Sequence, residues 1–569
     1  MFCAHGLPLA CFLTLTAVAR SQAGTTADPA AFVTAYFADL QDLHRRYDIP
    51  LSRESSARER SYLEGRQREF GSKPVTGLAR DAEIDLWLLR ADVAHRLAKI
   101  DRAEALRAQL APLLAHTGPL VLACEAHRRM EPAKAEAAAA MLDAAVKAIG
   151  AAQHNLEAAA FDGFTPPLAQ TAIEDLEALH RSLATWHEFR AGYDPIFSWW
   201  TSTPWQRYVE AQSHYCAAIR TRLIDGAAGD ASLVGDPLGE TALLADLRHE
   251  LIPYSPAELI AIAEREFVFC EREATKASEA LGFRGDWGKA LAHVKRQHRD
   301  PGAQPELIRE LAREAIAFLD ARDLVTIPDL ARECWRMSMM SPAAQLVNPF
   351  FLGGETIQVS FPTNTMEHDQ KLQSLRSNNE HFCRATVHHE LIPGHWLQHY
   401  MQARHRTYRA PFETPFWIEG WALYWEMRLY DLGFAKSEED RIGMLYWRKH
   451  RCARIVFSLN YHLGLWTAEQ CVDYLIERVG HERAAAVAEV RRSVQGGYSP
   501  LYQAAYMLGG LQLRALHLEL VGSGTMSERA FHDAVLQQNA IPIALVRAAL
   551  QPGAPTAASI TAWRFADAK

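Results

Sequence analysis

The segment with the clearest chemical potential runs from Val387 to Gln398 and reads Val-His-His-Glu-Leu-Ile-Pro-Gly-His-Trp-Leu-Gln. Glu390 lies between His389 and His395 in this segment, and Glu419 follows 24 residues after His395. Zinc accepts imidazole nitrogens and carboxylate oxygens as ligands, and a nearby carboxylate can act as general base towards a zinc-bound water. The sequence therefore predicts a zinc site with Glu390 as the base. The predicted ligands are His389, His395 and Glu419, which leave one position open for water.

The spacing of the two histidines differs from the common His-Glu-x-x-His pattern, whose histidines lie four residues apart on one helical face. His389 and His395 are six residues apart, and six residues of an unbroken helix turn through about 600°, which puts the rings on roughly opposite sides. Pro393 removes a backbone donor and Gly394 accepts unusual dihedral angles, so we expect a bulge that returns His395 to the side of His389. Two alternatives stay open: a register in which His388 is the ligand, and a plain histidine-rich surface helix.

Further motifs follow in a fixed order. His-Glu-x-x-Pro-Gly-His-x-x-Gln is followed by Glu-Gly-Trp-Ala-x-Tyr-x-Glu over residues 419–426. Other matches are Tyr254 to Leu259, Arg451 and Arg454, His462, Trp466-Thr467, Pro500, Tyr506, Gly509, Leu513-Arg514, Phe531-His532-Asp533 and Pro542. Together they resemble the DUF885 family of bacterial proteins, which in turn resembles the gluzincin peptidases of the angiotensin-converting-enzyme and neurolysin type. The likeness covers about residues 250–550.

The resemblance implies a fold and an activity. The expected fold is mainly α, a large helical gluzincin-like structure with a deep cleft and a small β-sheet beside the metal helix. The expected protein is a secreted zinc-dependent metallopeptidase with one Zn²⁺ per chain, and its partner is a short peptide substrate. Zinc would lower the pKa of its water and polarise the scissile carbonyl, while Glu390 would take the proton of that water and pass it to the leaving amine.

Two tyrosines and a further glutamate complete the predicted site. In enzymes of the angiotensin-converting type, a tyrosine hydroxyl downstream of the ligands stabilises the oxyanion that forms during attack on the carbonyl. By this resemblance Tyr506, six residues after Pro500, is the predicted donor, and Tyr502, one turn away on the same face, is the alternative. Glu426 lies seven residues after Glu419 on nearly the same helical face. It is either a carboxylate that orients a ligand histidine or a plain surface residue.

Residues that could hold the substrate are indicated only by the resemblance. A peptidase acting at a chain end needs a charged group for the terminus, and Arg514 is the family-matched residue, with a structural ion pair as the alternative. His462 also matches the family pattern, and either binds substrate or satisfies a buried network. The sequence does not distinguish endopeptidase from exopeptidase action.

Composition limits the other possibilities. The chain has 569 residues, of which 49% are hydrophobic and 22% charged, and its formal net charge is -8. It can bury a large core, and without a long basic run it is not expected to bind nucleic acid. Residues 1–23 are predicted to be a signal peptide, with an apolar run from Leu7 to Ala19 and cleavage after Ala23. A lipoprotein that carries its lipid on Cys11 is the less favoured alternative, because Pro8 stands where a lipobox has an aliphatic residue. The mature chain is then periplasmic or secreted, and with no later run of 18 apolar residues it has no stable membrane insertion.

The chain is predicted to divide into an N-terminal helical region, residues 24–240, and a metal-binding catalytic region, residues 241–569, which form one continuous two-lobed unit. An alanine-rich helix is expected from Pro132 to Gly150, and a capping box at Ser255 opens another helix. Short strands are expected over residues 324–328 and 354–361. In gluzincins a strand near the metal helix binds extended substrate, and this role passes by resemblance to residues 355–361.

Other functions fit the same residues. A degenerate relative could be a non-catalytic helical protein that binds peptides or partner proteins. A zinc amidase or esterase would use the same ligands and base. The presence of every expected catalytic group favours the peptidase.

Overall fold

The computed structural model describes residues 29–73, 78–158, 164–225, 233–345, 350–495, 498–553 and 555–567. The predicted signal peptide, residues 1–23, lies outside these ranges. Within them the chain forms 24 α-helices and one sheet of two short strands. The mainly α class predicted from the sequence is therefore confirmed. No helix of the described residues is long and apolar enough to cross a membrane.

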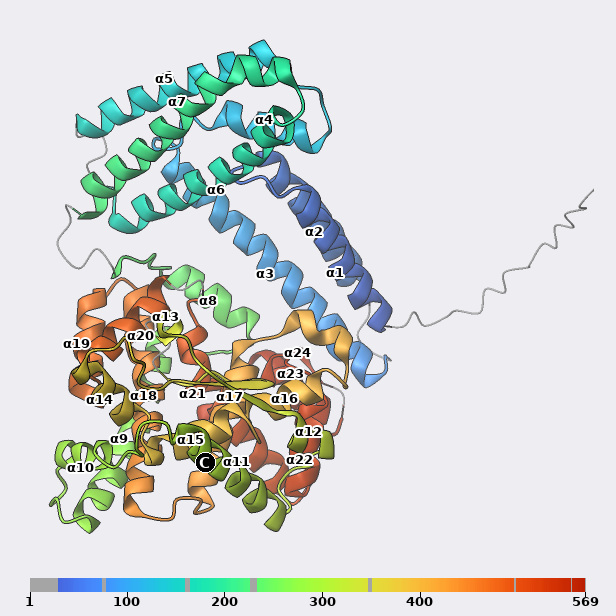
Figure 1. Ribbon diagram of the computed structural model, residues 1–569. Helices are drawn as coiled ribbons and strands as arrows, with labels where there is room; N and C mark the ends of the chain where they lie inside the picture. Colours follow the sequence, from blue (N-terminus) through green and yellow to red (C-terminus); the bar gives the residue numbers. More distant parts are fainter. Residues whose placement is uncertain are drawn as a thin grey trace, which may run out of the picture.

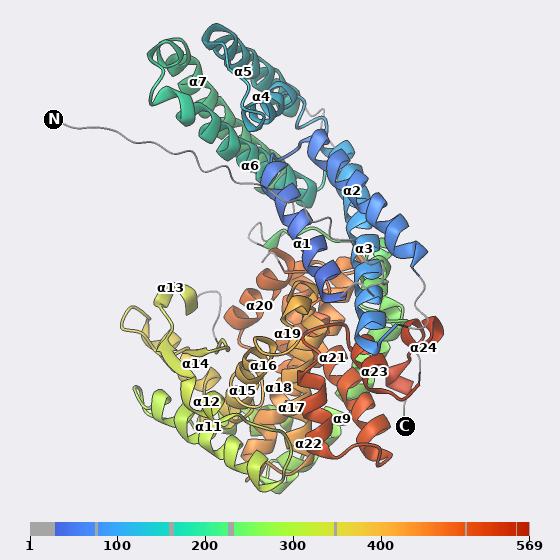
Figure 2. The same cartoon turned by 90° about the vertical axis from the view of Figure 1, so that its right-hand side faces the viewer.

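The first helices form a slanted group and a projecting bundle (Figures 1 and 2). Their bounds are α1 (Pro29–Arg46), α2 (Arg53–Ser72), α3 (Arg80–Leu110), α4 (Gly118–Arg128), α5 (Ala135–Glu157), α6 (Pro166–Ala191), α7 (Pro195–Ile219) and the π-helix η1 (Arg220–Asp225). The long helix α3 connects the main body to the bundle of α4–α7. The prediction that Gly150 ends the alanine-rich helix is wrong, because Ile149, Ala152 and Leu156 are buried and packing carries α5 past the glycine.

The main body contains all later elements. Its helices are α8 (Glu240–His249), α9 (Pro256–Ala280), α10 (Trp287–Lys295), α11 (Gln304–Ala321), α12 (Asp329–Cys334), α13 (Pro342–Gln345), α14 (His368–Ser377), α15 (Glu380–Glu390), α16 (His395–Gln402), η3 (Thr407–Phe412), α17 (Pro415–Asp431), α18 (Glu438–His462), α19 (Ala468–Val479), α20 (Arg483–Gln495), α21 (Tyr502–His517), η4 (Leu518–Gly522), α22 (Glu528–Leu536), α23 (Ile543–Leu550), α24 (Ala557–Thr561) and η5 (Phe565–Asp567). The predicted capping box is present at the start of α9, where the side chains of Ser255 and Glu258 bond each other's backbone N–H.

Buried apolar side chains form two clusters. The larger cluster extends through the main body and includes residues of α1, α2 and the first half of α3. The smaller cluster belongs to the bundle of α4–α7 and to the neighbouring segments. The chain before residue 240 thus contributes to both clusters, and its division from residues 241–569 stays a prediction.

The small sheet lies beside the end of α15. Strands β1 (Arg336–Met339) and β2 (Thr356–Val359) pair in parallel, and Leu352 forms an antiparallel bridge to Gln358. The strand expected over 354–361 is confirmed. The strand expected over 324–328 is wrong: Leu324 and Val325 are buried in an irregular segment, and both the N–H and the hydroxyl of Thr326 donate to the Asp533 carboxylate instead of a ladder.

Helices α17 and α21 cross with their backbones in contact. A Cβ atom added to Gly509 would lie 1.9 Å from the carbonyl oxygen of Phe416, and one added to Gly420 would lie 2.6 Å from Gly509. Gly420 follows Glu419 on α17, and Gly509 follows Tyr506 by less than one turn on α21. The crossing therefore fixes how closely the predicted zinc ligand approaches the predicted tyrosine.

The substitution Gly509→Ala tests this crossing. Because a methyl group has no room there, we expect a loss of stability of about 1–3 kcal/mol from overpacking, seen as a lower thermal unfolding midpoint. Gly150→Ala is the matched control, since a Cβ at Gly150 has nothing within 4 Å and alanine is favoured over glycine inside a helix by up to about 1 kcal/mol. A midpoint for Gly509→Ala equal to that of the unchanged protein would contradict the close crossing.

Candidate functional site

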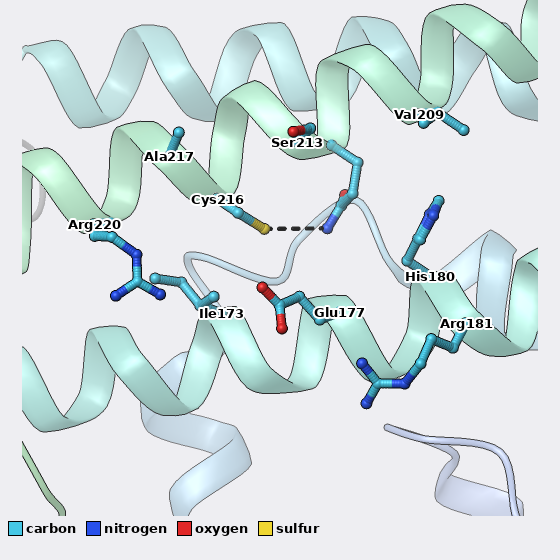
Figure 3. A pocket seen from close by; sticks show the side chains of 10 residues that line it. Ile173, Glu177, His180, Arg181, Val209, Ser213, Cys216, Ala217 and Arg220 are labelled. Carbon is cyan, nitrogen blue, oxygen red and sulfur yellow. Dashed lines mark hydrogen bonds between the residues drawn. The ribbon is translucent and has the colours of Figure 1, made fainter. Parts of the chain in front are cut away.

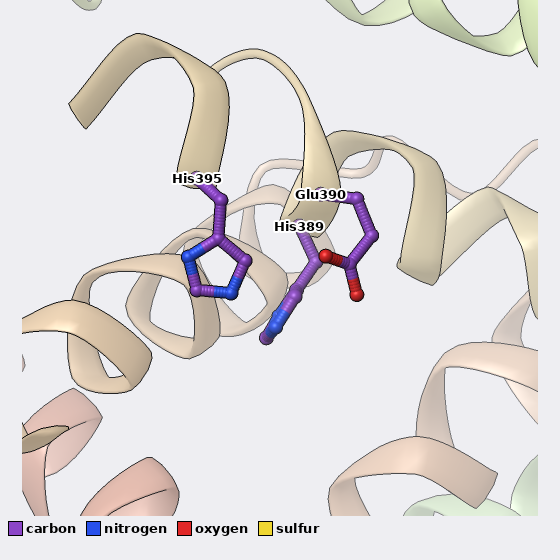
Figure 4. Close-up of side chains that lie close together, drawn as sticks. All are labelled: His389, Glu390 and His395. Carbon is purple, nitrogen blue, oxygen red and sulfur yellow. The ribbon is translucent and has the colours of Figure 1, made fainter. Parts of the chain in front are cut away.

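The helix that carries the first histidine is interrupted where the sequence has Pro393 and Gly394. Helix α15 ends at Glu390, α16 begins at His395, and the Ile392–Pro393 peptide bond is cis. The Gly394 N–H donates to the His388 carbonyl at 2.9 Å, and a Cβ on Gly394 would lie 1.8 Å from the His389 carbonyl oxygen. The ring centroids of His389 and His395 are 4.8 Å apart. The predicted bulge is thus present, and it brings the two rings together with Glu390 (Figure 4).

Glu419 approaches the two imidazoles from α17. Its Oε2 atom lies 3.3 Å from Nε2 of His395 and 3.7 Å from Nε2 of His389. Two ligand atoms on one tetrahedral zinc, at about 2.0–2.2 Å from it, lie about 3.3–3.6 Å apart. This Oε2 atom is buried and has no hydrogen-bond partner among the described residues. The distance to His395 falls in this range and the distance to His389 is slightly longer, so the carboxylate atom lies close to where a ligand that shares one ion with these imidazoles would be.

The charge state of Glu419 suits a ligand. Burial by itself would raise the pKa of this carboxyl, but His395 and His389 hold the pKa well below its ordinary value. Burial likewise disfavours the charged form of His389, yet Glu419 and Glu426 raise the pKa of His389 to about 9. A metal ion bound by this imidazole would therefore displace a proton from it.

Glu426 is buried behind His389 and is no surface carboxylate. Its Oε1 atom lies 2.6 Å from Nδ1 of His389 and 3.2 Å from a guanidinium nitrogen of Arg451. Burial opposes its ionisation, but Arg451 and His389 lower the pKa of Glu426 to about 2. An ionised carboxylate on Nδ1 directs Nε2 of His389 towards Glu419, which is the usual arrangement of a carboxylate behind a ligand histidine.

Gln398 has the corresponding position behind His395, and sequence analysis gave it no role. Its amide nitrogen lies 2.6 Å from Nδ1 of His395 and donates to the Ile418 carbonyl at 3.0 Å. Gln398 therefore fixes the His395 ring to the helix turn that carries Glu419. The signal in the sequence was the spacing of three residues from His395, which places both side chains on one helical face.

His388 is separate from this cluster. It is 1% exposed, and its ring packs edge-on against Phe434 with centroids 5.6 Å apart. Burial lowers the pKa of His388 to about 4. The His389 register is the one in which the imidazole faces His395 and Glu419.

The two predicted tyrosines both reach the site and make different contacts. The Tyr502 hydroxyl donates to Oε1 of Glu419. The Tyr506 ring stacks on the His389 ring at 6.2 Å, and its hydroxyl accepts a hydrogen bond from Arg492 at 3.4 Å. The hydroxyl proton of Tyr502 is thus donated to a predicted ligand. The hydroxyl of Tyr506 makes one hydrogen bond with the described residues, in which it accepts, so its own proton is not donated to any of them.

Glu390 packs closely against the segment that precedes β2. A Cβ added to Gly353 would be 2.2 Å from its Oε2 atom, so the segment before β2 covers the carboxylate with bare backbone. Burial raises the pKa of Glu390, and the Glu419 charge acts in the same direction, while His389 and His395 oppose them. A raised pKa makes a half-buried carboxylate a better proton acceptor.

These groups line a cavity of about 370 Å³. Its walls are Phe350, Phe351, Leu352, Gly353, Gln358, Thr386, His389, Glu390, His395, His399, Ile418, Glu419, Trp447, Arg451, Arg454, Arg492, Tyr498, Tyr502 and Tyr506. A cavity of about 520 Å³ lies between α6 and α7 in the bundle, where Cys216, Glu177 and His180 are among the lining residues (Figure 3). The one group of at least three possible metal-ligating side chains in the described part of the chain, His389, Glu390 and His395, lines the smaller cavity, and Glu419 approaches both histidines there. The smaller cavity is therefore the candidate site.

Two predicted substrate-binding residues lie elsewhere. Arg514 is 3.4 Å from Asp431, as in the ion-pair alternative, and does not line the cavity. His462 is buried at the end of α18, and its carbonyl accepts a hydrogen bond from the Gly239 N–H at 2.8 Å. The structure does not bring either side chain to His389, His395 and Glu419.

Comparison with known proteins identifies the family to which this mainly helical chain belongs. The chain belongs to the family described as "Bacterial protein of unknown function (DUF885)", whose model matches residues 34–550. The resemblance noted in the sequence therefore extends much further towards the N-terminus than residue 250. No curated protein matches the chain.

Two solved structures share the fold. One is a "putative lipoprotein of unknown function" from Shewanella oneidensis, with a TM-score of 0.67 and 16% identity over 92% of this chain and 99% of that one. The other is a "putative lipoprotein" from Colwellia psychrerythraea, with a TM-score of 0.55 and 16% identity over 92% of this chain and 97% of that one. At this identity the likeness concerns the fold alone.

The convergence of three ligand atoms predicts about one zinc ion per chain, removable by a chelator. Elemental analysis of gently purified protein should show it. His389→Ala should abolish stoichiometric zinc, because it removes a ligand, and His388→Ala should retain it. The opposite result in the two variants would mean that the ligand register is shifted by one residue.

Proposed function

We propose that this protein is a secreted zinc-dependent metallopeptidase that hydrolyses peptide bonds of short peptides. The observation that carries the proposal is the convergence of Glu419 with His389 and His395 in a cavity that also contains Glu390. Three protein ligands with an open fourth position distinguish catalytic from structural zinc sites. The gluzincin-like character of the fold and of its cleft, and the export of the chain, are parts of the same proposal.

The residues divide the chemistry among them. His389, His395 and Glu419 would hold the ion, and zinc bound there would lower the pKa of a coordinated water and polarise a carbonyl. Glu390 would accept a proton at its carboxylate and return it to the departing amine. Glu426 would act through the His389 imidazole, whose Nδ1 atom it contacts at 2.6 Å, and Gln398 would fix the position of the His395 ring against the Ile418 carbonyl.

The first test of this function is Glu390→Gln. The substitution retains the size of the side chain and removes its basicity, so zinc content should stay close to normal. Turnover of a mixed peptide digest, followed by mass spectrometry, should fall by about 100- to 10,000-fold, the usual contribution of general base catalysis. Turnover within about twofold of the unchanged protein would move the base to another group. Cleavage of amides or esters without cleavage of peptides would favour an amidase or esterase.

The second test concerns the oxyanion. The Tyr506 hydroxyl accepts from Arg492 and so retains its proton for a developing negative charge, which supports Tyr506 over Tyr502 as donor. Tyr506→Phe removes the hydroxyl and leaves the ring, and we expect kcat to fall by roughly 100-fold or more with little change in KM. The matched variant Tyr502→Phe should have the smaller effect on kcat. A fall confined to Tyr502→Phe would transfer the role by one turn.

A further inference from the structure

Three arginines line the cavity, and their charges are balanced differently. Arg451 lies 3.2 Å from Glu426, and Arg454 lies 2.7 Å from Glu489. No carboxylate of the described residues lies within 4.0 Å of Arg492, and its buried Nε has no hydrogen-bond partner among them. Arg492 is therefore the cavity arginine whose charge is left without a close counter-ion.

Tyrosines hold this guanidinium in place. Its Cζ atom lies 4.9 Å from the ring centroid of Tyr498 and 5.9 Å from that of Tyr502, and a terminal nitrogen donates to the Tyr506 hydroxyl. Stacking on aromatic rings preserves the planar fork of donors, which matches the two oxygens of a carboxylate. The Nε atom still has its hydrogen to donate. The Arg492 guanidinium is thus positioned to bind an anion from outside the described residues.

The charge balance of the cavity favours the same ligand. Glu390 and Glu419 would offset the two charges of a zinc ion, while Glu426 and Glu489 offset Arg451 and Arg454. The three arginines thus exceed the two carboxylates by one positive charge, and Arg492, which Glu489 attracts from one turn away on α20 without forming a close ion pair, is the arginine with no carboxylate of the described residues within 4.0 Å. The setting is partly buried, where the interaction between charges is stronger than in water.

Arg492 is connected to the predicted metal ligands through two tyrosines. Tyr502 contacts it with its ring and donates its hydroxyl proton to Glu419, while Tyr506 contacts it with its hydroxyl and stacks on His389. A single tyrosine therefore lies between Arg492 and each of two predicted metal ligands, Tyr502 before Glu419 and Tyr506 before His389. Since an extended residue spans about 3.3–3.6 Å, an anion on Arg492 would be only a few residues from the bond being cut.

We propose that Arg492 binds the C-terminal carboxylate of the peptide substrate, so that the enzyme releases short fragments from the C-terminal end. This inference rests on the proposed peptidase function and specifies its substrate class. A C-terminal carboxylate always lies on the leaving-group side of the scissile bond, so its proximity to the metal limits the length of the fragment released. The cavity of about 370 Å³ is near the lower end of the roughly 300–1,000 Å³ range of ligand sites, which suits a chain end.

Peptide binding to zinc-supplemented Glu390→Gln protein tests the proposal, because this variant should bind the peptide without cleaving it. The probes are a labelled tetra-alanine peptide with a free C-terminal carboxylate and the same peptide as its amide. We expect the amide to bind about 10- to 100-fold more weakly, since a charge-assisted hydrogen-bonded pair is lost. When Arg492→Gln is added, the peptide with the free carboxylate should bind as weakly as the amide. Arg492→Lys keeps the positive charge but loses the planar guanidinium donors, so it should give an intermediate preference for the free carboxylate.

Controls separate this role from folding and from other arginines. Arg483 lies on the same helix and forms an exposed ion pair with Asp473. Arg483→Gln should therefore leave the preference for the free carboxylate over the amide unchanged. A third peptide, amidated and ending in glutamate, should bind no better than the alanine amide. Tight binding of that peptide, equal affinity for the acid and the amide, or loss of the preference in Arg514→Gln but not in Arg492→Gln would each overturn the proposal.

The outcome also separates this inference from the proposed function. Selective binding of the free carboxylate by a protein that hydrolyses no peptide would support the role of Arg492 and refute the peptidase. Hydrolysis by a protein that binds acid and amide equally would support the peptidase and refute the role of Arg492.

Discussion

The site depends on a single backbone contact, the approach of Gly394 to the carbonyl oxygen of His389. A Cβ atom at residue 394 would lie 1.8 Å from that oxygen, so the chain can return on itself there only with glycine. Without the return, a continuous helix would turn His395 away from His389. Gln398 contacts His395 from within the same helix, α16, and Glu419 contacts it from α17, so their positions are useful only once this turn is made.

A layer of buried charges surrounds the predicted ligands. Glu426 lies between His389 and Arg451, and Glu489 lies against Arg454, all with little exposure to solvent. Removal of one partner from such a buried pair typically costs about 3–5 kcal/mol, because the other charge is left uncompensated. The α17–α21 crossing at Gly420 and Gly509 holds the opposite wall, with the tyrosines, at a fixed distance. The ligands are thus held from two sides by interactions that tolerate little change.

The sequence predicted the local chemistry better than the geometry of the whole site. The helical class, the Ser255 capping box and the bulge at Pro393-Gly394 follow from local rules, and each is present. The strand expected at 324–328 failed because the distant Asp533 takes the hydrogen bonds of Thr326. Such tertiary partners cannot be read from a local pattern of apolar residues.

Long-range contacts also explain which site residues were missed. Arg514 matched a family motif but pairs with Asp431, whereas Arg492 belongs to no motif and lines the cavity. No spacing rule links Arg492 on α20 to Tyr502 and Tyr506 on α21, since only the packing of the two helices onto the cavity brings them together. A single sequence therefore indicates ligands that share one motif more readily than residues that bind substrate from separate helices.

The arrangement separates two electrostatic tasks that would otherwise interfere. Charges directly behind the predicted ligands are paired within the protein, as Glu426 is with His389 and Arg451, which leaves Nε2 of His389 and Oε2 of Glu419 facing each other. Arg492, the cavity arginine with no carboxylate of the described residues within 4.0 Å, is separated from the predicted ligands by a tyrosine. An anionic substrate group attracted to Arg492 would therefore be held away from the metal ligands, where a carboxylate would compete with Glu419 for the same ion. In this view Tyr502 and Tyr506 act as spacers as well as donors, because their length sets the distance between the group that binds the substrate and the groups that act on it.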